Sequence, residues 1–199
     1  MFWKHTQFWK DALIQATLAF FESGSTDVIF TNADLISIPK DGAPSIDNFR
    51  PLSLKRVPHK VINSILRKRL VSAIQPLLRE NQSGFLPNKG CRDSIAMVSA
   101  LIARALRSGK PLAMLFVDFS KAFSAIDRRL IPAVLVHYGI PKRWVELVNF
   151  WLLDETYNLG AETLEVGCGI SMGCCLAPFL FIVCTDYIMS GVMKIYAAS

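Results

Sequence analysis

Apolar residues recur along this chain at intervals of three and four over several stretches, and that spacing is typical of amphipathic helices. The clearest case is 59–78, in which Arg69 falls among the apolar positions and would need a partner. Pro141 suits the first turn of a helix. The predicted helices cover 7–22 (ended by Gly24), 59–78, 92–107, a stretch from near Ser124, a stretch after Pro141, and 176–190.

Three segments have the features of β-strands. Residues 34–39 alternate between apolar and polar positions, are rich in β-branched side chains and end at a proline. Leu112–Val117 is a nearly continuous apolar run, which predicts a central strand buried on both faces. Residues 155–166 are expected to form a short hairpin, and 40–51 and 79–91 are expected to be loops. The pattern therefore predicts an α+β fold.

The stretch 166–185 contains no charged residue and has the length of a transmembrane helix. Three glycines in its first half and Pro178 interrupt it, and the dense apolar part, Leu176–Cys184, is too short to cross a bilayer. We therefore expect a buried core helix after a glycine-rich turn, and no membrane partner. The first eleven residues lack a clean apolar core, so we expect no signal peptide and an intracellular protein.

Composition narrows the class of protein further. Hydrophobic residues make up 52% of the 199 positions, which excludes a disordered chain. The five cysteines form no CxxC pair, and no histidine stands near them in the sequence. A zinc site or a disulfide framework is therefore not expected, and a reducing compartment is the default.

The net charge of +6 is unevenly distributed. Residues 39–110 hold 14 Lys and Arg against 4 Asp and Glu, whereas both flanking regions are slightly acidic. A set of basic residues lies there that suits phosphate contacts or, alternatively, a solvated face: Lys40, Arg50, Lys55, Arg56 and Lys60. The excess charge of the segment favours a polyanion partner such as nucleic acid.

Two further features could carry chemistry. Asp118 follows the predicted central strand, where it is either a site residue or a turn residue. Asp127 fits a capping box with Ser124 and is interpreted as a helix cap. The turn Gly169–Cys175 opens a helix whose N–H groups could face an anion, but it lacks the spacing of a phosphate-binding loop, and tight packing is the favoured role.

Together these features resemble the reverse transcriptase domain of non-LTR (LINE-type) retrotransposons. The resemblance rests on several phrases in a fixed order that extend over nearly the whole chain. They are Phe8-Trp9-Lys10, Asp34 to Lys40 (DLISIPK), Asn48 to Leu54 (NFRPLSL), Lys60, Glu80 to Phe85 (ENQSGF), Phe116 to Phe123 (FVDFSKAF), and Gly169 to Phe181 (GISMGCCLAPFLF).

The resemblance implies the fold of a right-hand polymerase. Residues 1–110 would form an N-terminal helix and the fingers, and 111–199 a partial palm with an antiparallel sheet packed on helices. The reverse transcriptase domain itself would cover about 27–199, with the thumb absent. An RNA template, a DNA primer and a deoxynucleoside triphosphate are the implied partners, and the family implies the nucleus.

The resemblance also implies roles for particular residues. Two Mg²⁺ ions, or Mn²⁺ ions, would be held by three aspartates in a two-metal mechanism, with Asp118 as the first ligand and the Phe119 carbonyl assisting. The implied nucleotide-binding residues are Lys40, Arg50, Phe123 (under the sugar), Met172 and Gly173. Lys55, Arg56 and Lys60 would contact nucleic acid.

The sequence departs from the family pattern at several positions, of which Cys175 and Ala177, in place of the usual Pro and Ser, are expected to have small effects. Ser124 stands where the family usually has Asp, and Met172 stands where it commonly has Gln. The Tyr/Phe-Ala-Asp-Asp hairpin is absent, and with it two of the three metal-binding carboxylates. We therefore expect this chain to be inactive alone, as a truncated polymerase or as a non-catalytic nucleic-acid-binding remnant. An unpaired palm strand would also make it prone to self-association.

Overall fold

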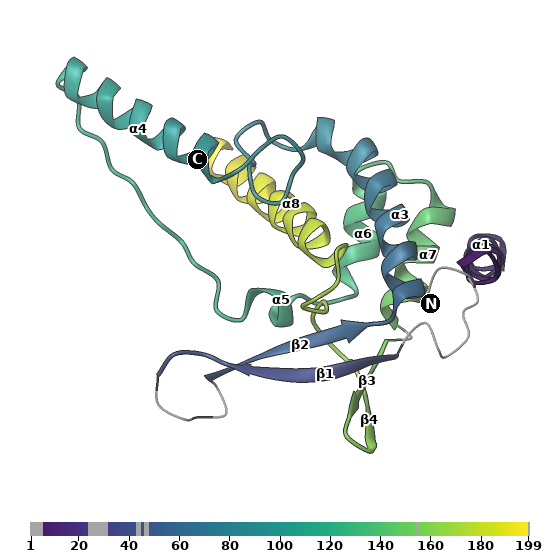
Figure 1. Ribbon diagram of the computed structural model, residues 1–199. Coiled ribbons are helices and arrows are strands. Elements are labelled where there is room, and N and C mark those ends of the chain that lie inside the picture. The colour runs from purple at the N-terminus through teal and green to yellow at the C-terminus, as the bar shows by residue number, and fades with distance from the viewer. Residues whose placement is uncertain (1–5, 24–31, 43–44, 46–47, 154, 199) are drawn as a thin grey trace.

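The computed structural model describes the chain except for residues 1–5, 24–31, 43–44, 46–47, 154 and 199. Most of the helices lie together on one side of a small sheet (Figure 1). In chain order the elements are α1 (Thr6–Ser23), β1 (Asn32–Pro39), β2 (Phe49–Lys55), α3 (Val57–Ile74), η3 (Gln75–Leu77), α4 (Cys91–Ser108), α5 (Ala122–Ala125), α6 (Leu130–His137), α7 (Lys142–Leu153), β3 (Thr156–Leu159), β4 (Glu162–Glu165) and α8 (Ala177–Ala198). The α+β class is therefore confirmed, and the expected stop of α1 at Gly24 lies outside the described residues.

The sheet joins two hairpins that are far apart in the sequence. Its strand order is β2-β1-β3-β4, with antiparallel pairs at both sides and a parallel pair, β1 with β3, in the middle. Asn32 stands opposite Thr156 in that parallel register. The resemblance implied an antiparallel palm sheet within 111–199, and the two strands of that region, β3 and β4, do pair antiparallel, but they belong to a mixed sheet that also contains β1 and β2. Helices fill the long connection from β2 to β3, which allows the two middle strands to run in the same direction.

One hydrophobic core lies among the helices. It draws on α3, α6, α7 and α8, whose buried side chains include Leu66, Leu135, Val148 and Phe179. Helix α1 joins this core through Phe20, whose ring lies 5.1 Å from that of Trp151. The core thus contains residues from both sides of the division expected near residue 110.

Arg69, the cation among the apolar positions of α3, has the interaction partner that its position in the sequence led us to expect. Its guanidinium carbon lies 5.1 Å from the ring centroid of Trp144 on α7. A cation over an indole face is attracted by the ring quadrupole, so this contact ties α3 to α7.

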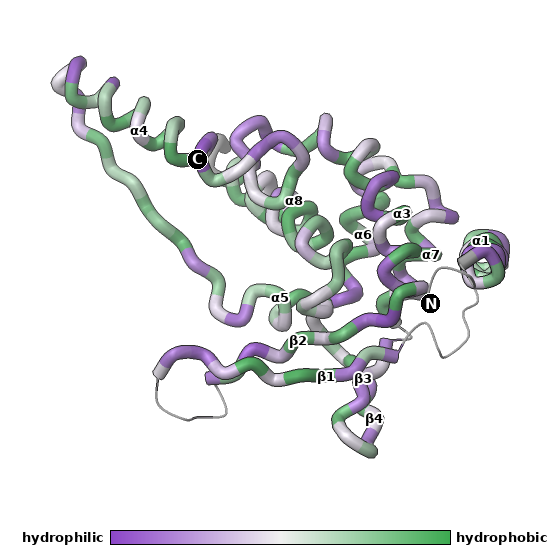
Figure 2. The backbone as a smooth tube through the Cα atoms, viewed as in Figure 1, coloured by the Kyte–Doolittle hydropathy of each residue, from purple (hydrophilic) through white to green (hydrophobic). Residues whose placement is uncertain are grey.

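The segment 110–119 differs most from the expectation. It is extended but belongs to no strand, and its side chains are exposed, with Leu115 at 89% and Val117 at 70%. Figure 1 shows it running between α4 and α5 away from the helices, and Figure 2 shows how apolar much of it is. The prediction of a strand buried on both faces is wrong here because none of the described strands pairs with it.

The region after this segment is also less helical than predicted. Helix α5 is a single turn, and the next helix, α6, begins only at Leu130. The capping box between Ser124 and Asp127 is not formed. Instead the Asp127 carboxylate accepts the backbone N–H of Arg129 at 2.9 Å and pairs with its guanidinium at 2.7 Å. Asp127 therefore keeps a local structural role through a different partner.

Helix α8 combines a buried first half with an exposed end. Residues such as Phe179 and Leu180 lie in the core, as predicted for a core helix. Asp186 is buried too, and it accepts hydrogen bonds from Arg79 at 2.8 Å and from the Tyr138 hydroxyl at 2.7 Å. By length and hydropathy alone, Ala177–Ile195 of this helix would qualify as a membrane span, and a third of that window is buried.

Candidate functional site

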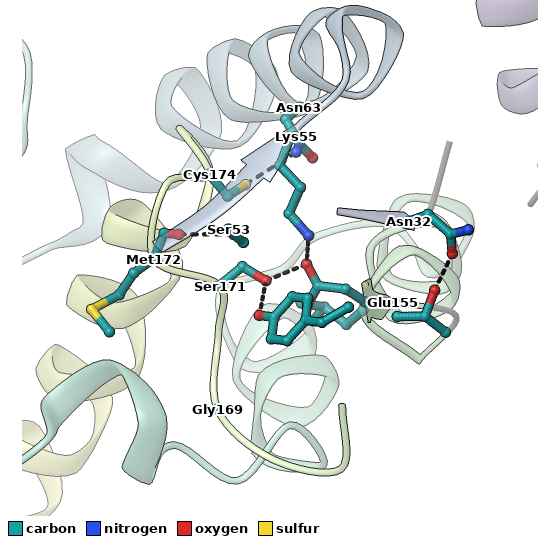
Figure 3. Close-up of polar contacts among 12 residues, drawn as sticks. Asn32, Ser53, Lys55, Asn63, Glu155, Gly169, Ser171, Met172 and Cys174 are labelled. Carbon is teal, nitrogen blue, oxygen red and sulfur yellow. Dashed lines mark hydrogen bonds and ion pairs between the residues drawn. The ribbon is translucent and has the colours of Figure 1, made fainter. Parts of the chain in front are cut away.

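The glycine-rich turn before α8 is held on both sides by backbone hydrogen bonds. The N–H groups of Gly169 and Ile170 donate to the carbonyls of Ile126 and Phe123, at 2.9 and 2.8 Å. On the other side, the Met172 carbonyl accepts both the N–H of Ser53, at 2.8 Å, and its hydroxyl, at 2.7 Å (Figure 3). The turn is therefore fixed between β2 and the chain around α5.

Two glycines of this turn fill places where no side chain fits. Gly169 has φ +75°, and a Cβ there would lie 2.7 Å from the Cα of Ser124. Gly173 has φ +106°, and a Cβ there would lie 2.5 Å from the carbonyl oxygen of Ser53. Both the left-handed backbone and the close approach require glycine. The tight-packing role that the sequence favoured for this turn is confirmed.

A buried network of charged side chains underlies the turn. The Glu155 carboxylate accepts from the Lys55 ammonium, the Ser171 hydroxyl and the Arg128 guanidinium, the last at 2.7 Å. Arg128 also donates from Nε to the Gly169 carbonyl at 2.6 Å. Figure 3 shows Lys55 and Ser171 converging on Glu155. Because buried charges are costly unless paired, this arrangement fixes β2, β3 and the turn in one geometry.

Lys55 does not have the role that its position in the basic set suggested. Its side chain is buried and forms an ion pair with Glu155, so a phosphate cannot reach it in this structure. Desolvation lowers the pKa of Lys55 to about 8, which still leaves the amine protonated at neutral pH. The expected nucleic-acid contact by Lys55 is therefore corrected to a structural ion pair.

The remaining basic residues form two separate pairs on the surface. Lys40 and Arg50 lie at one end of the β1–β2 hairpin, where the Lys40 N–H donates to the Asn48 carbonyl at 2.7 Å. Arg56 and Lys60 lie at the other end, at the start of α3. All four side chains are exposed. Arg56 lies six positions after Arg50 in the sequence, which is about 20 Å along the hairpin.

Aromatic side chains connect the expected catalytic segment to α8. The Phe123 ring stacks on Phe181 with centroids 5.1 Å apart, and Phe119 meets the same ring edge-on at 6.2 Å. Lys121 adopts a left-handed backbone, φ 50°, which turns the extended segment into α5. The structure thus brings Phe119 and Phe123 beside the glycine-rich turn that contains Met172. The N–H of Ile170 in that turn donates a hydrogen bond to the Phe123 carbonyl.

Asp118 is exposed at the end of the extended segment. Within the part of the chain that the structure describes, no group of three or more His, Cys, Asp or Glu side chains could hold a metal ion. Two metal ions bridged by carboxylates need more acidic ligands than Asp118 provides. The described residues therefore do not fit a complete two-metal centre.

A small cavity lies beside the turn, between the sheet and α5. It measures about 80 Å³, and Ser53, Ser124, Gly169 and Met172 are among the residues that line it. Sites for small organic ligands usually measure about 300–1,000 Å³. This cavity is too small to enclose a nucleotide, so a nucleotide at this turn would have to lie on the open surface.

Glu155, Arg128 and Ser171 were not identified from the sequence. Their partners lie far away in the chain: Glu155 is 100 residues from Lys55, and Arg128 is 41 from Gly169. The one available signal was weak, since Glu155 is only the first residue of a predicted hairpin in a chain with few charges. No local pattern indicates that such a residue is buried.

Comparisons with known proteins agree on one family. The family described as reverse transcriptase (RNA-dependent DNA polymerase) matches residues 38–198. The chain is also similar to the Pol polyprotein of the type-2 retrotransposable element R2DM of Drosophila melanogaster, with 30% identity over 79% of this chain and 15% of that protein. The Pol polyprotein of the type-1 retrotransposable element R2 of Bradysia coprophila is 32% identical over 71% of this chain and 16% of its own length.

A third relative is the transposon TX1 uncharacterized 149 kDa protein of Xenopus laevis, which is 27% identical over 81% of this chain. The chain spans only 13% of that protein's length. In each of these three relatives it therefore corresponds to a small part of a much longer polypeptide.

Proposed function

Because this chain belongs to the reverse transcriptase (RNA-dependent DNA polymerase) family, we propose that it supplies the fingers and the adjoining part of the palm of an RNA-directed DNA polymerase of a non-LTR retrotransposon. The observation that carries this proposal is the family match over 38–198, which contains the β1–β2 hairpin end, the glycine-rich turn and Asp118. The substrates would be an RNA template, a DNA primer and deoxynucleoside triphosphates.

Within this function, the nucleotide would lie on the surface between the hairpin and the turn. Lys40 and Arg50 would face its phosphates, since both are exposed at one end of the hairpin. Phe123 would lie under the sugar, with its ring held by Phe181. Met172 and Gly173 would border the base pair, because their backbone is fixed on β2.

Divalent ions are general in the reverse transcriptase family, and Asp118 would be the first ligand. As the described residues form no carboxylate cluster, we propose that the polypeptide of these 199 residues does not polymerise by itself. Primer extension on poly(rA)/oligo(dT) with Mg²⁺ or Mn²⁺ tests this, and no incorporation is expected. Incorporation that disappears in Asp118→Ala would contradict it.

Nucleic-acid binding is the part of the function that this polypeptide would retain. Arg56 and Lys60 are exposed cations whose phosphate contacts would release counterions. We expect the affinity for an RNA–DNA duplex to fall with salt, and each Ala substitution of these residues to reduce the log–log slope by about 1. Lys142→Ala, which changes an exposed cation on α7, is the matched control. A salt-independent affinity would rule out the phosphate contacts.

A further inference from the structure

Trp151 on α7 buries a polar atom that lacks a partner among the described residues. Its side chain is 3% exposed, and none of the described groups accepts a hydrogen bond from its indole N–H. The ring is held by its neighbours, since its centroid lies 5.1 Å from that of Phe20 and 4.3 Å from that of His59. Because a buried donor without an acceptor is costly, this indole calls for a further ligand.

The indole lines a second cavity, which lies between the glycine-rich turn, α7 and α8. This cavity measures about 20 Å³, and Leu152, Ile170 and Leu180 form part of its apolar wall. One water molecule needs a cavity of about 10–15 Å³. The space therefore fits a single water, and it is too small for a nucleotide or any other organic ligand.

Three further polar side chains share this cavity with Trp151. They are His59, Glu155 and Ser171, and all three are buried. Cavities lined only by apolar groups stay dry, whereas water occupies those that offer it hydrogen-bond partners. The lining of this cavity is therefore of the kind that binds water.

The Glu155 carboxylate can accept one more hydrogen bond. Its Oε1 accepts from Lys55 and Ser171, and its Oε2 accepts from Arg128. An ionised carboxylate offers about four acceptor positions, so one position on Oε2 remains when the contacts of the described residues are counted. The Ser171 oxygen, whose proton goes to Glu155, is a further acceptor in the same cavity.

We propose that this cavity binds one internal water molecule. The water accepts the hydrogen bond of the Trp151 indole and donates to the Glu155 carboxylate and to the Ser171 oxygen. About three hydrogen bonds are usual for a buried water, and such a bridge is nearly as favourable as a direct hydrogen bond. The water thereby joins α7 to the charge network that underlies the turn. This inference stands apart from the proposed function, because it uses only the packing of the chain.

Water contacts of the indole protons test the proposal on the intact chain. The tryptophans are labelled with ¹⁵N, and the four indole signals are assigned with single Trp→Phe variants. The Trp151 indole proton should show an NOE and an ROE to water of opposite signs, as expected for a water that stays far longer than surface hydration. Trp144, whose ring is only partly buried on the same helix, should not show this pair of signals. Their absence at Trp151, or a Trp151 signal that shifts when sulfate is replaced by chloride, would overturn the proposal.

A cavity-filling variant tests the site itself. Ala177 lines the cavity at the start of α8, so the larger side chain of Ala177→Val should displace the water while Trp151 and Glu155 stay in place. Relaxation dispersion of ¹⁷O in the solvent counts long-lived waters without a contribution from hydroxyl protons such as that of Ser171. The count should fall by about one in Ala177→Val and stay unchanged in Ala133→Val, at an exposed position on α6. An unchanged count in a folded Ala177→Val protein would contradict the proposal, and if that variant does not fold, the wild-type NOE decides.

Discussion

At the scale of single residues, Glu155 is the residue on which the buried charge network depends. One carboxylate satisfies two buried cations, Lys55 and Arg128, and also accepts from Ser171. Removing one member of such a group is more damaging than replacing all of it, because the remaining charges stay buried without a partner. Its substitution therefore tests whether the turn is held as the structure indicates.

Glu155→Gln should lower the free energy of unfolding by about 3–5 kcal/mol, since it leaves Lys55 and Arg128 without a counter-charge. Urea unfolding followed by circular dichroism measures this difference. Glu162→Gln, at an exposed position in β4, is the control and should change the value by less than about 0.5 kcal/mol. If the two variants were equally stable, the network would contribute nothing.

The environment of Tyr138 predicts how the stability of the protein changes at alkaline pH. Burial raises the pKa of its phenol well above the usual value of 10, and the hydrogen bond to Asp186 adds to the shift. The folded state then keeps the proton that the unfolded chain releases near pH 10. The resulting stability is complete below pH 10 and is lost as the pH rises beyond it.

Comparing urea midpoints between pH 9 and 11 measures this effect. The loss of stability should be shallower in Tyr138→Phe than in the wild type, while Tyr187→Phe, at a more exposed tyrosine, should follow the wild type. Identical slopes for all three proteins would show that Tyr138 does not carry the effect.

At the scale of elements, most of the helices could be predicted from the sequence, whereas the pairing of the strands could not. Helices α1, α3, α4 and α7 appear where the apolar periodicity placed them, because that spacing is a local property. The turn signal Asp41-Gly42 predicts a loop over 40–51, whereas β2 begins at Phe49 and runs through Pro51. Here Pro51 lies on an edge strand, where the missing N–H costs no ladder bond.

The site shows the same division between local and distant information. The need for glycine at the turn could be anticipated, whereas Lys55 was assigned to the surface because nothing near it in the sequence reveals Glu155. The run from Leu112 to Val117 likewise has the composition of a buried strand, but burial requires a partner that composition cannot supply. Contacts across a hundred residues are thus the part that sequence reasoning missed.

The turn before α8 provides a test at this scale. Gly169→Ala and Gly173→Ala should each destabilise the protein by at least about 1–3 kcal/mol, because a Cβ would meet backbone atoms in a left-handed conformation. Gly167→Ala is the matched control, since a Cβ there meets nothing within 4 Å. If urea unfolding showed that Gly167→Ala lowers the free energy of unfolding as much as the other two substitutions do, the tight packing would be contradicted.

At the scale of the whole molecule, one core serves both regions that the family resemblance separates, and a large apolar surface remains outside it. Helix α4 has no buried residue, and the segment after it is exposed from residue 111 to 120 (Figures 1 and 2). An extended apolar segment with unpaired backbone groups is a template for pairing with another chain.

We therefore expect this polypeptide to self-associate in solution. Light scattering should give a mass above the monomer's 22.2 kDa, and the double variant Leu115→Lys/Val117→Lys should shift it toward the monomer without loss of stability. Val136→Lys, at an isolated exposed position on α6, should leave the association unchanged. A wild-type protein that stays monomeric would contradict this expectation.

The parallel pairing of β1 with β3 also has a consequence for the order of folding during synthesis. The β1–β2 hairpin is complete once residue 55 has left the ribosome. Its strand β1, however, pairs with β3 at Thr156, which follows Asn32 by 124 residues and is synthesised much later. Until then the inner edge of the hairpin stays open and Lys55 has no counter-ion. Such non-local closure favours slow folding, so the nascent chain would depend on chaperones for much of its synthesis.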